Sequence, residues 1–199
     1  MPERRYKLLF VITHMLFIIV RLVYGQRYKR SHATTQINRV TTQEKVLLGG
    51  VAVSYFVPNG FWLFSNRLKF AQLGLRPWMR LSGFFISLAS IGFFAWVHKT
   101  LGDNWSPTLE IRNQHELIED GPYATVRHPM YTAIYGYYIG LIPLMNNWFP
   151  GLMALLGFTA LYVGRVDHEE QLMREQFGAA YEEYAQRTGR LLPRWQPRE

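Results

Sequence analysis

The sequence predicts an all-α fold: an integral membrane bundle of about five transmembrane helices, with a cytosolic loop and an amphipathic helix near the C-terminus. Three observations support this class. Apolar residues make up 49% of the 199-residue chain, and they gather in long runs instead of being spread evenly. The runs approach the roughly 17–25 residues that a helix needs to cross a bilayer. Basic residues fall between the runs, and residues 1–199 are expected to form a single membrane-embedded domain.

Five apolar runs are the candidate spans. They cover residues 8–24, 46–64, 81–97, 129–145 and 148–164. The second run contains Pro58-Asn59-Gly60, which predicts a broken or kinked helix. The third run carries small side chains suited to close helix packing. These are Ser82, Gly83, Ser87, Ala89, Ser90 and Gly92.

We expect the first apolar run to be a membrane span and not a cleaved signal peptide, and we expect an amphipathic helix near the C-terminus. The first run holds His14 and Arg21, to which we assign no role, because such residues commonly bond to a neighbouring helix or reach the membrane surface. Only Asn146 and Asn147 separate the last two runs, which predicts a tight helical hairpin. Apolar residues at helical spacing predict an amphipathic helix over residues 166–188, ended by Gly189 and Pro193.

Composition excludes several classes of protein. The 22 Lys and Arg exceed the 14 Asp and Glu, but they form no single block of the kind that binds nucleic acid. With no cysteine and no histidine pair at zinc-binding spacing, we expect neither a disulfide nor a metal site. The motifs of soluble nucleotide-binding folds and of common hydrolases are also absent from the sequence.

Charge sets the expected orientation. With the N-terminus outside, fifteen of the 22 Lys and Arg lie on the inner side and seven on the outer side. The positive-inside rule then places residues 98–127 and the C-terminal segment together in the cytosol. Residues 98–127 are too long for a plain connection, and apolar residues within them indicate that they fold against the rest of the protein.

Two polar motifs beside the apolar runs are the candidate site: GPYATVRHPMY at residues 121–131 and RVDHEEQL at residues 165–172. Pro129 can begin a helix, which leaves Arg127 and His128 at a helix N-terminus where an anion is favoured. Each motif alone could be an interfacial helix start or a surface ion pair. Their co-location at a membrane edge, where charge is costly, favours a site for an anionic substrate and a cationic or hydroxyl-rich cofactor.

These motifs, with HELI at residues 115–118 and the later FGAAYEEY, resemble the isoprenylcysteine carboxyl methyltransferase family of integral membrane enzymes, which is related to phospholipid N-methyltransferases. The resemblance covers residues 98–193, the expected catalytic half. It implies S-adenosylmethionine as cofactor and Arg165 as the group that faces the acceptor carboxylate, with Glu169 beside it. The residues that it implies for the cofactor are Glu110, His115, Glu116, Leu117, Ile118, Tyr123, His128, Pro129, Met130, Tyr131 and Glu169.

The reaction implied by this resemblance is methyl transfer to a lipophilic acceptor at the membrane interface, foremost carboxyl O-methylation of an isoprenylcysteine-like substrate. A carboxylate is already ionised at neutral pH, so the protein must supply alignment and not a general base. Eukaryotic members have further N-terminal spans, whereas this chain has little before its five runs. We therefore expect a prokaryotic inner or plasma membrane protein whose active site faces the cytosol, with membrane lipids and a prenylated or lipid substrate as partners.

Three alternatives stay open. An amine-headed phospholipid would make the protein an N-methyltransferase, and a preference for NADPH would indicate a membrane sterol or enone reductase. Failure to bind any nucleotide-like cofactor would favour a non-enzymatic, lipid-binding membrane protein.

Overall fold

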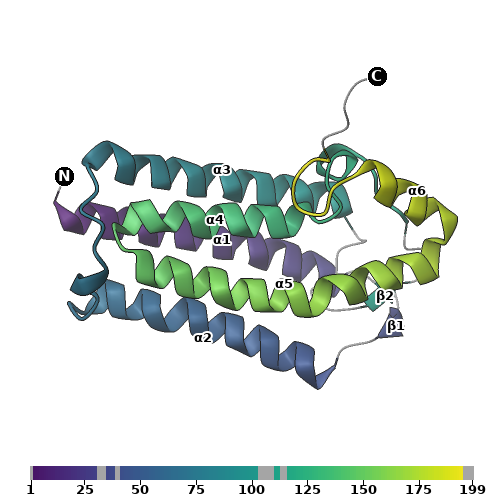
Figure 1. Ribbon diagram of the computed structural model, residues 1–199, viewed down its shortest axis with the longest axis horizontal. Helices are drawn as coiled ribbons and strands as arrows, with labels where there is room; N and C mark the ends of the chain where they lie inside the picture. The colour runs from purple at the N-terminus through teal and green to yellow at the C-terminus, as the bar shows by residue number, and fades with distance from the viewer. Residues whose placement is uncertain (1, 31–34, 39–40, 103–109, 113–115, 195–199) are drawn as a thin grey trace.

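The computed structural model describes residues 2–30, 35–38, 41–102, 110–112 and 116–194 (Figure 1). Helices account for most of this part of the chain, and the predicted all-α class is confirmed. The helices are α1 (Glu3–Arg30), α2 (Thr42–Phe64), α3 (Pro77–Leu101), α4 (Pro129–Met145), α5 (Trp148–Phe177) and α6 (Ala179–Arg187), with short 3-10 turns η1 (Lys69–Ala71) and η3 (Gly121–Ala124). Two short strands, β1 (Thr35–Asn38) and β2 (Glu110–Arg112), pair antiparallel and tie the segment after α1 to the long polar stretch.

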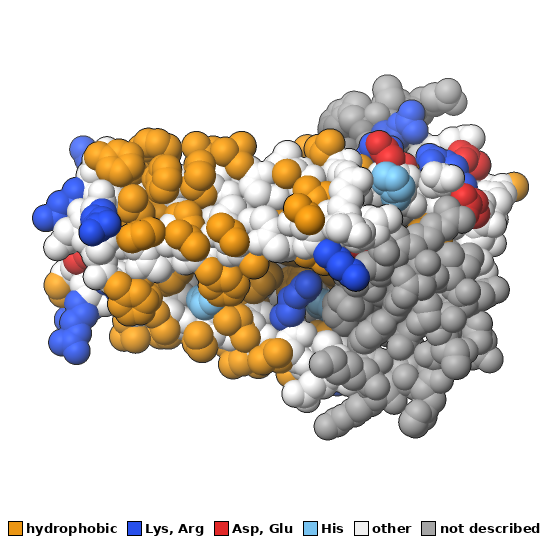
Figure 2. All heavy atoms as spheres, turned by 90° about the horizontal axis from the view of Figure 1, so that it is seen from below, with side chains coloured by type: hydrophobic (Ala, Val, Ile, Leu, Met, Phe, Trp, Pro, Cys, Tyr) orange, Lys and Arg blue, Asp and Glu red, His pale blue; other side chains and the backbone are white. Residues whose placement is uncertain are grey.

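Four of the described helices, α1, α2, α3 and α5, are long and apolar enough to cross a membrane. Helix α4 is also apolar, and its 17 residues lie at the lower limit of about 17–25 for a span. Large apolar side chains such as Val53, Phe85 and Val163 are more than half exposed on the outside of the bundle. Figure 2 shows apolar side chains across the left and the centre of one face. A continuous surface of this kind is typical of lipid-facing helices.

The second span is not broken, and one expected helix is divided. Helix α2 continues through Pro58, and next to it the Asn59 side-chain amide donates to the Tyr55 carbonyl at 2.7 Å. The predicted amphipathic helix over residues 166–188 is not one element, because α5 continues from the apolar hairpin to Phe177 without a breaker. The break comes at Gly178, whose φ of 54° suits glycine, and α6 begins after it.

The predicted hairpin between α4 and α5 is confirmed. Asn146 ends α4 in the left-handed conformation, and the side chain of Asn147 caps α5 by accepting a hydrogen bond from the backbone N–H of Phe149 at 3.2 Å. Figure 1 shows this hairpin at the same end of the bundle as the N-terminus, while α6 lies at the opposite end.

Small residues bring α3 and α4 into the most extensive helix contact of the described fold. Gly83 and Ser87 of α3 are buried against Gly140 of α4, and the Ser87 hydroxyl donates to the Gly83 carbonyl at 2.9 Å. A Cβ added at Gly83 would lie 2.5 Å from the Gly140 carbonyl oxygen and 2.5 Å from the Leu144 nitrogen. Of the predicted small residues, Ser82, Ala89 and Gly92 are instead exposed.

We expect Gly83→Ala to destabilise the protein by about 1–3 kcal/mol, because both clashing atoms belong to a backbone that cannot move without separating the helices. Thermal unfolding of the purified protein in detergent measures this. Gly92→Ala is the matched control on the same helix, since nothing lies within 4 Å of its added Cβ and alanine favours a helix. Equal melting temperatures for the two variants would contradict close α3–α4 packing.

The remaining contacts leave space inside the bundle. Helix α1 packs on α3 and α4, and α2 packs along α5, while α1 and α2 meet through side chains such as Phe10 and Trp62. Buried side chains of the helices, among them Phe94, Tyr137, Leu141 and Phe158, form the core. The site described next lies beside this core, at the end of the bundle that carries α6.

Candidate active site

A cavity of about 520 Å³ opens between the helices. Its volume falls within the roughly 300–1,000 Å³ of typical small-molecule pockets. It brings together nine of the residues predicted for the site. They are Glu116, Leu117, Ile118, Tyr123, His128, Met130, Tyr131, Arg165 and Glu169. The two motifs, which are distant in the sequence, therefore face one space.

Three predicted residues need separate mention. Pro129 is the buried first residue of α4, so it positions its neighbours His128 and Met130 at the cavity wall. His115 lies outside the described residues. Glu110 belongs to strand β2, opposite Asn38, and its side chain is also outside the description.

Glu169 is the point at which the two motifs meet. Its Oε1 accepts hydrogen bonds from Arg165 Nε at 2.6 Å and from the Tyr131 hydroxyl at 3.1 Å. Its Oε2 lies 3.5 Å from Nδ1 of His128. The Glu169 side chain keeps 21% of its surface exposed, and it lines the cavity. Its carboxylate is thus oriented by three protein groups and still accessible to a ligand.

Arg165 has a second acidic partner that the sequence did not indicate. Its Nη1 lies 3.0 Å from Oε1 of Glu44, which stands in the first turn of α2. Both side chains are nearly buried, at 10% exposure for Arg165 and 3% for Glu44. A carboxylate in the first turn also suits the helix dipole. The charge of Arg165 is therefore shared between Glu44 and Glu169.

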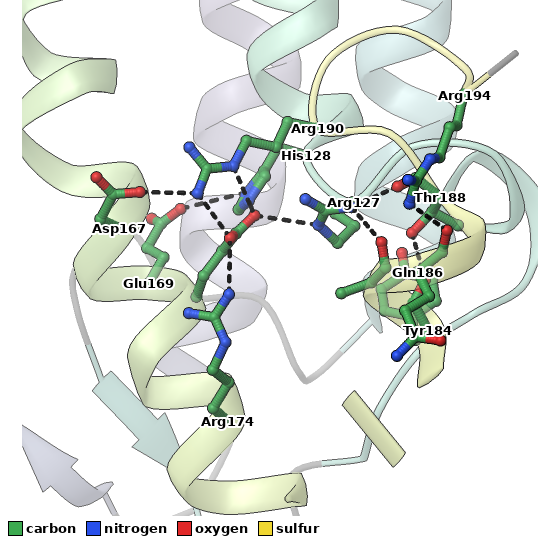
Figure 3. A network of polar contacts seen from close by, with 12 residues as sticks. Arg127, His128, Asp167, Glu169, Arg174, Tyr184, Gln186, Thr188, Arg190 and Arg194 are labelled. Carbon is green, nitrogen blue, oxygen red and sulfur yellow. Dashed lines mark hydrogen bonds and ion pairs between the residues drawn. The ribbon is translucent and has the colours of Figure 1, made fainter. Parts of the chain in front are cut away.

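Glu170 is the centre of a buried network and is 1% exposed. Figure 3 shows the side chains of Arg127, His128, Arg174 and Arg190 gathered in this network. Arg127 Nε donates to Oε1 at 3.0 Å, and Arg190 donates to both oxygens, at 3.1 and 2.9 Å. His128 Nε2 lies 3.3 Å from Oε1, and Arg174 Nη2 lies 3.4 Å from Oε2. In the sequence, burial of Glu170 was indicated only by its position four residues after Val166, which puts both on the buried face of α5.

The segment after α6 covers the helix start that was expected to bind an anion. The backbone N–H groups of Arg127 and His128 donate to the carbonyls of Gly189 and Arg190, at 2.8 and 3.0 Å. The Arg127 guanidinium also donates to the carbonyls of Ala185 and Thr188. These groups are therefore engaged by the protein. The N–H groups of Arg127 and His128 are not available to an anion, because the chain folds back on them.

Tyrosines close the polar end of the cavity. Tyr184 donates its hydroxyl to the Tyr123 carbonyl at 2.8 Å, and both residues line the cavity together with Tyr181. Burial raises the pKa of Tyr123, Tyr181 and Tyr184 above the usual range, so these hydroxyls stay neutral. Hydrogen bonds with Glu170 raise the pKa of Arg190, against the smaller opposing effect of burial.

The other end of the cavity is apolar and belongs to α1, α2, α4 and α5. Its lining includes Phe17, Val51, Phe56, Ile134 and Phe158.

A polar pair interrupts this apolar end. His14 Nδ1 and the Tyr55 hydroxyl are 2.7 Å apart, and Tyr55 in turn contacts the Tyr137 hydroxyl at 3.0 Å. His14 therefore bonds to a neighbouring helix. Helices α1 and α2, which precede the expected catalytic half, contribute a large share of the wall.

Fold and site define the class: a multi-pass helical membrane protein whose cavity joins a charged end to an apolar interior. Residues 82–175 match the model of the isoprenylcysteine carboxyl methyltransferase (ICMT) family. The family resemblance that the motifs predicted is confirmed.

Individual relatives point the same way. The probable protein-S-isoprenylcysteine O-methyltransferase of Oryza sativa subsp. indica is 31% identical over 96 residues, which are 47% of this chain and 50% of that protein. The nickel-cobalt-cadmium resistance protein NccN of Alcaligenes xylosoxydans xylosoxydans is 27% identical over 109 residues, 54% of this chain and 51% of that protein. The chain thus spans about half the length of these curated relatives.

A solved structure supports the fold. The eukaryotic intramembrane Ras methyltransferase ICMT aligns with a TM-score of 0.54 and 23% identity, over 79% of this chain and 54% of that one. At this identity the likeness concerns the arrangement of the helices.

Proposed function

We propose that the protein is an S-adenosylmethionine-dependent methyltransferase that methylates a lipophilic acceptor, foremost the carboxylate of an isoprenylcysteine-like molecule. The observation that carries this proposal is the cavity with two unlike ends. One end is lined by Glu169 and its polar partners, and the other by apolar side chains of the membrane helices. The family match to residues 82–175 supports the same reaction class.

The residues at the polar end fit this cofactor. Its ammonium and ribose hydroxyl groups suit carboxylates, and Glu116 and Glu169 both line the cavity. Its adenine suits an apolar and aromatic surface, which Leu117, Ile118 and Tyr123 provide. S-adenosylmethionine, when bound, supplies a methyl group on a sulfonium sulfur, and an ionised carboxylate accepts it without a general base.

The protein's own contribution is position and exclusion of water. His128, Tyr131 and Arg165 hold the Glu169 carboxylate in one orientation, and the tyrosines at the polar end screen it from solvent. Arg165 stands between this carboxylate and the apolar end of the cavity. We assign it to the acceptor's carboxylate, as a guanidinium whose own charge is moderated by Glu44 and Glu169.

An acceptor with a long apolar tail can reach the site through the membrane. Leu22 of α1 and Phe56 of α2 line the apolar end of the cavity and are each 57% exposed, so this end reaches the surface of the bundle. We place the polar end at the cytosolic surface of a prokaryotic inner or plasma membrane. The distribution of basic residues supports this orientation, since the end that carries α6 holds most of them.

Titration of the detergent-purified protein tests the proposal. We expect calorimetric binding of S-adenosylhomocysteine and no binding of NADPH, because the site offers carboxylates for a cationic ligand. Radiolabelled methyl transfer to an N-acetylated, S-farnesylated cysteine, compared with transfer to phosphatidylethanolamine, then identifies the acceptor class. Preference for NADPH would make the protein a reductase, and binding of neither nucleotide would leave a lipid-binding protein. Transfer to the amine-headed lipid alone would make it an N-methyltransferase.

A further inference from the structure

Arg21 is a charged residue in an apolar helix and lines the cavity. It belongs to α1, one of the helices able to cross a membrane. Its charge interacts electrostatically with Arg165, with Tyr138 of α4 and with His98 of α3. Arg21 and Arg165 line the same cavity as Phe17, Ile18 and Leu22, so we take Arg21 to stand where the charged and the apolar parts of the cavity meet.

The other arginines of the cavity wall are already engaged, and Arg21 differs from them. Arg165 is shared by Glu44 and Glu169, and Arg127 is held by Glu170 and two backbone carbonyls. Within the described part of the chain, Arg21 makes neither a hydrogen bond nor an ion pair. A guanidinium carries five N–H donors, so this side chain keeps its full capacity to bind a planar anion.

Arg21 is exposed on α1, within the part of this helix able to cross a membrane, and a lone cation there is costly. The neighbouring positions of α1 that line the cavity, Phe17, Ile18 and Leu22, are apolar, and ionised groups within a membrane span are expensive unless they serve a partner. Arg165 adds repulsion, since it is a like charge in electrostatic range. Both costs fall when an anion lies between the two guanidinium groups. Figure 2 shows basic and histidine side chains within a hollow of the apolar surface.

We propose that Arg21 binds the anionic group of the lipophilic acceptor from the side of α1, opposite Arg165, and thereby selects acceptors that carry a carboxylate. The inference rests on the proposed function and names the residue that sets its substrate class. The acceptor's apolar tail would then extend past Phe17 and Val51, and its carboxylate would stay at the junction where Glu169 orients the cofactor. Arg21 lies outside residues 82–175, so the family match does not include it.

The test compares binding of two probes that differ only in charge: an N-acetylated, S-farnesylated cysteine with a free carboxylate, and its carboxamide. We expect the wild type to prefer the carboxylate, and Arg21→Met to lose at least tenfold of that preference while its affinity for the carboxamide is unchanged. Arg21→Lys should retain part of the preference, because it keeps the charge but not the planar fork. Arg4→Met is the matched control, because Arg4 is exposed on the same helix and away from the cavity.

Affinity for S-adenosylhomocysteine verifies that each variant is folded, and it should not change. Equal preference in the wild type and Arg21→Met, or no preference in the wild type, would overturn the inference. The measured quantity is binding affinity, so the anion site can be tested whether or not the protein transfers methyl groups. Loss of preference in Arg21→Met without methyl transfer by the wild type would support the anion site and refute the reaction. If the wild type transfers methyl groups and Arg21→Met keeps the preference for the carboxylate, the reaction is supported and the anion site is refuted.

Discussion

Replacing Glu170 by glutamine is expected to lower the free energy of unfolding by about 3–5 kcal/mol, the usual cost of removing one partner from a buried ion pair. Glu170 is 1% exposed, and Arg127, which depends on it, is 11% exposed. In the variant, the charge of Arg127 would be left buried without its carboxylate. Arg190 would also lose one of its two hydrogen bonds, because glutamine keeps a single acceptor oxygen, although it keeps Asp167 at 2.8 Å.

The effect should extend to the site. Glu170 joins the start of α4 to the segment after α6, and His128 at that start lines the cavity. Thermal unfolding in detergent measures the stability, and S-adenosylhomocysteine titration measures the site. Glu175→Gln is the matched control, since Glu175 is exposed on the same helix and should shift stability by less than about 0.5 kcal/mol. A melting temperature for Glu170→Gln equal to that of the control would show that the network contributes nothing.

Glu169→Gln is expected to have the opposite profile: a large loss of cofactor affinity with a smaller loss of stability. Loss of a charge-assisted hydrogen bond costs about 1.5–3 kcal/mol, which corresponds to roughly 10- to 150-fold in the dissociation constant. Stability should fall less than in Glu170→Gln, because Glu169 is 21% exposed and Arg165 retains Glu44.

Calorimetric titration with S-adenosylhomocysteine measures the affinity of this variant. Asp167→Asn is the control: it removes an acid two positions earlier on α5 whose side chain is 73% exposed. Its affinity should match that of the wild type. Unchanged affinity in Glu169→Gln would restrict Glu169 to its contacts with Arg165 and Tyr131 and remove it from the cofactor site.

The alternation of apolar runs and charged segments was sufficient to predict the helices. Burial in lipid requires a continuous apolar stretch whatever its neighbours are, so α1 to α5 could be recognised from local composition. The hairpin at Asn146-Asn147 could be recognised because its caps are local as well. The continuity of α2 through Pro58 could not be recognised, and neither could the end of the last span, which depended on Gly178 and not on the first charges.

By itself, the sequence determined the membrane class, the family resemblance and the meeting of the two motifs, because charged residues beside apolar runs gather at a membrane edge. Only the tertiary structure decided how each charge is used. Glu44 reaches Arg165 because α2 packs along α5, and Glu170 is buried because the chain returns over the start of α4. Arg21 faces the cavity because α1 packs on α3 and α4. The energy of a charge depends on its partners in space, and those partners come from elements that no local pattern brings together.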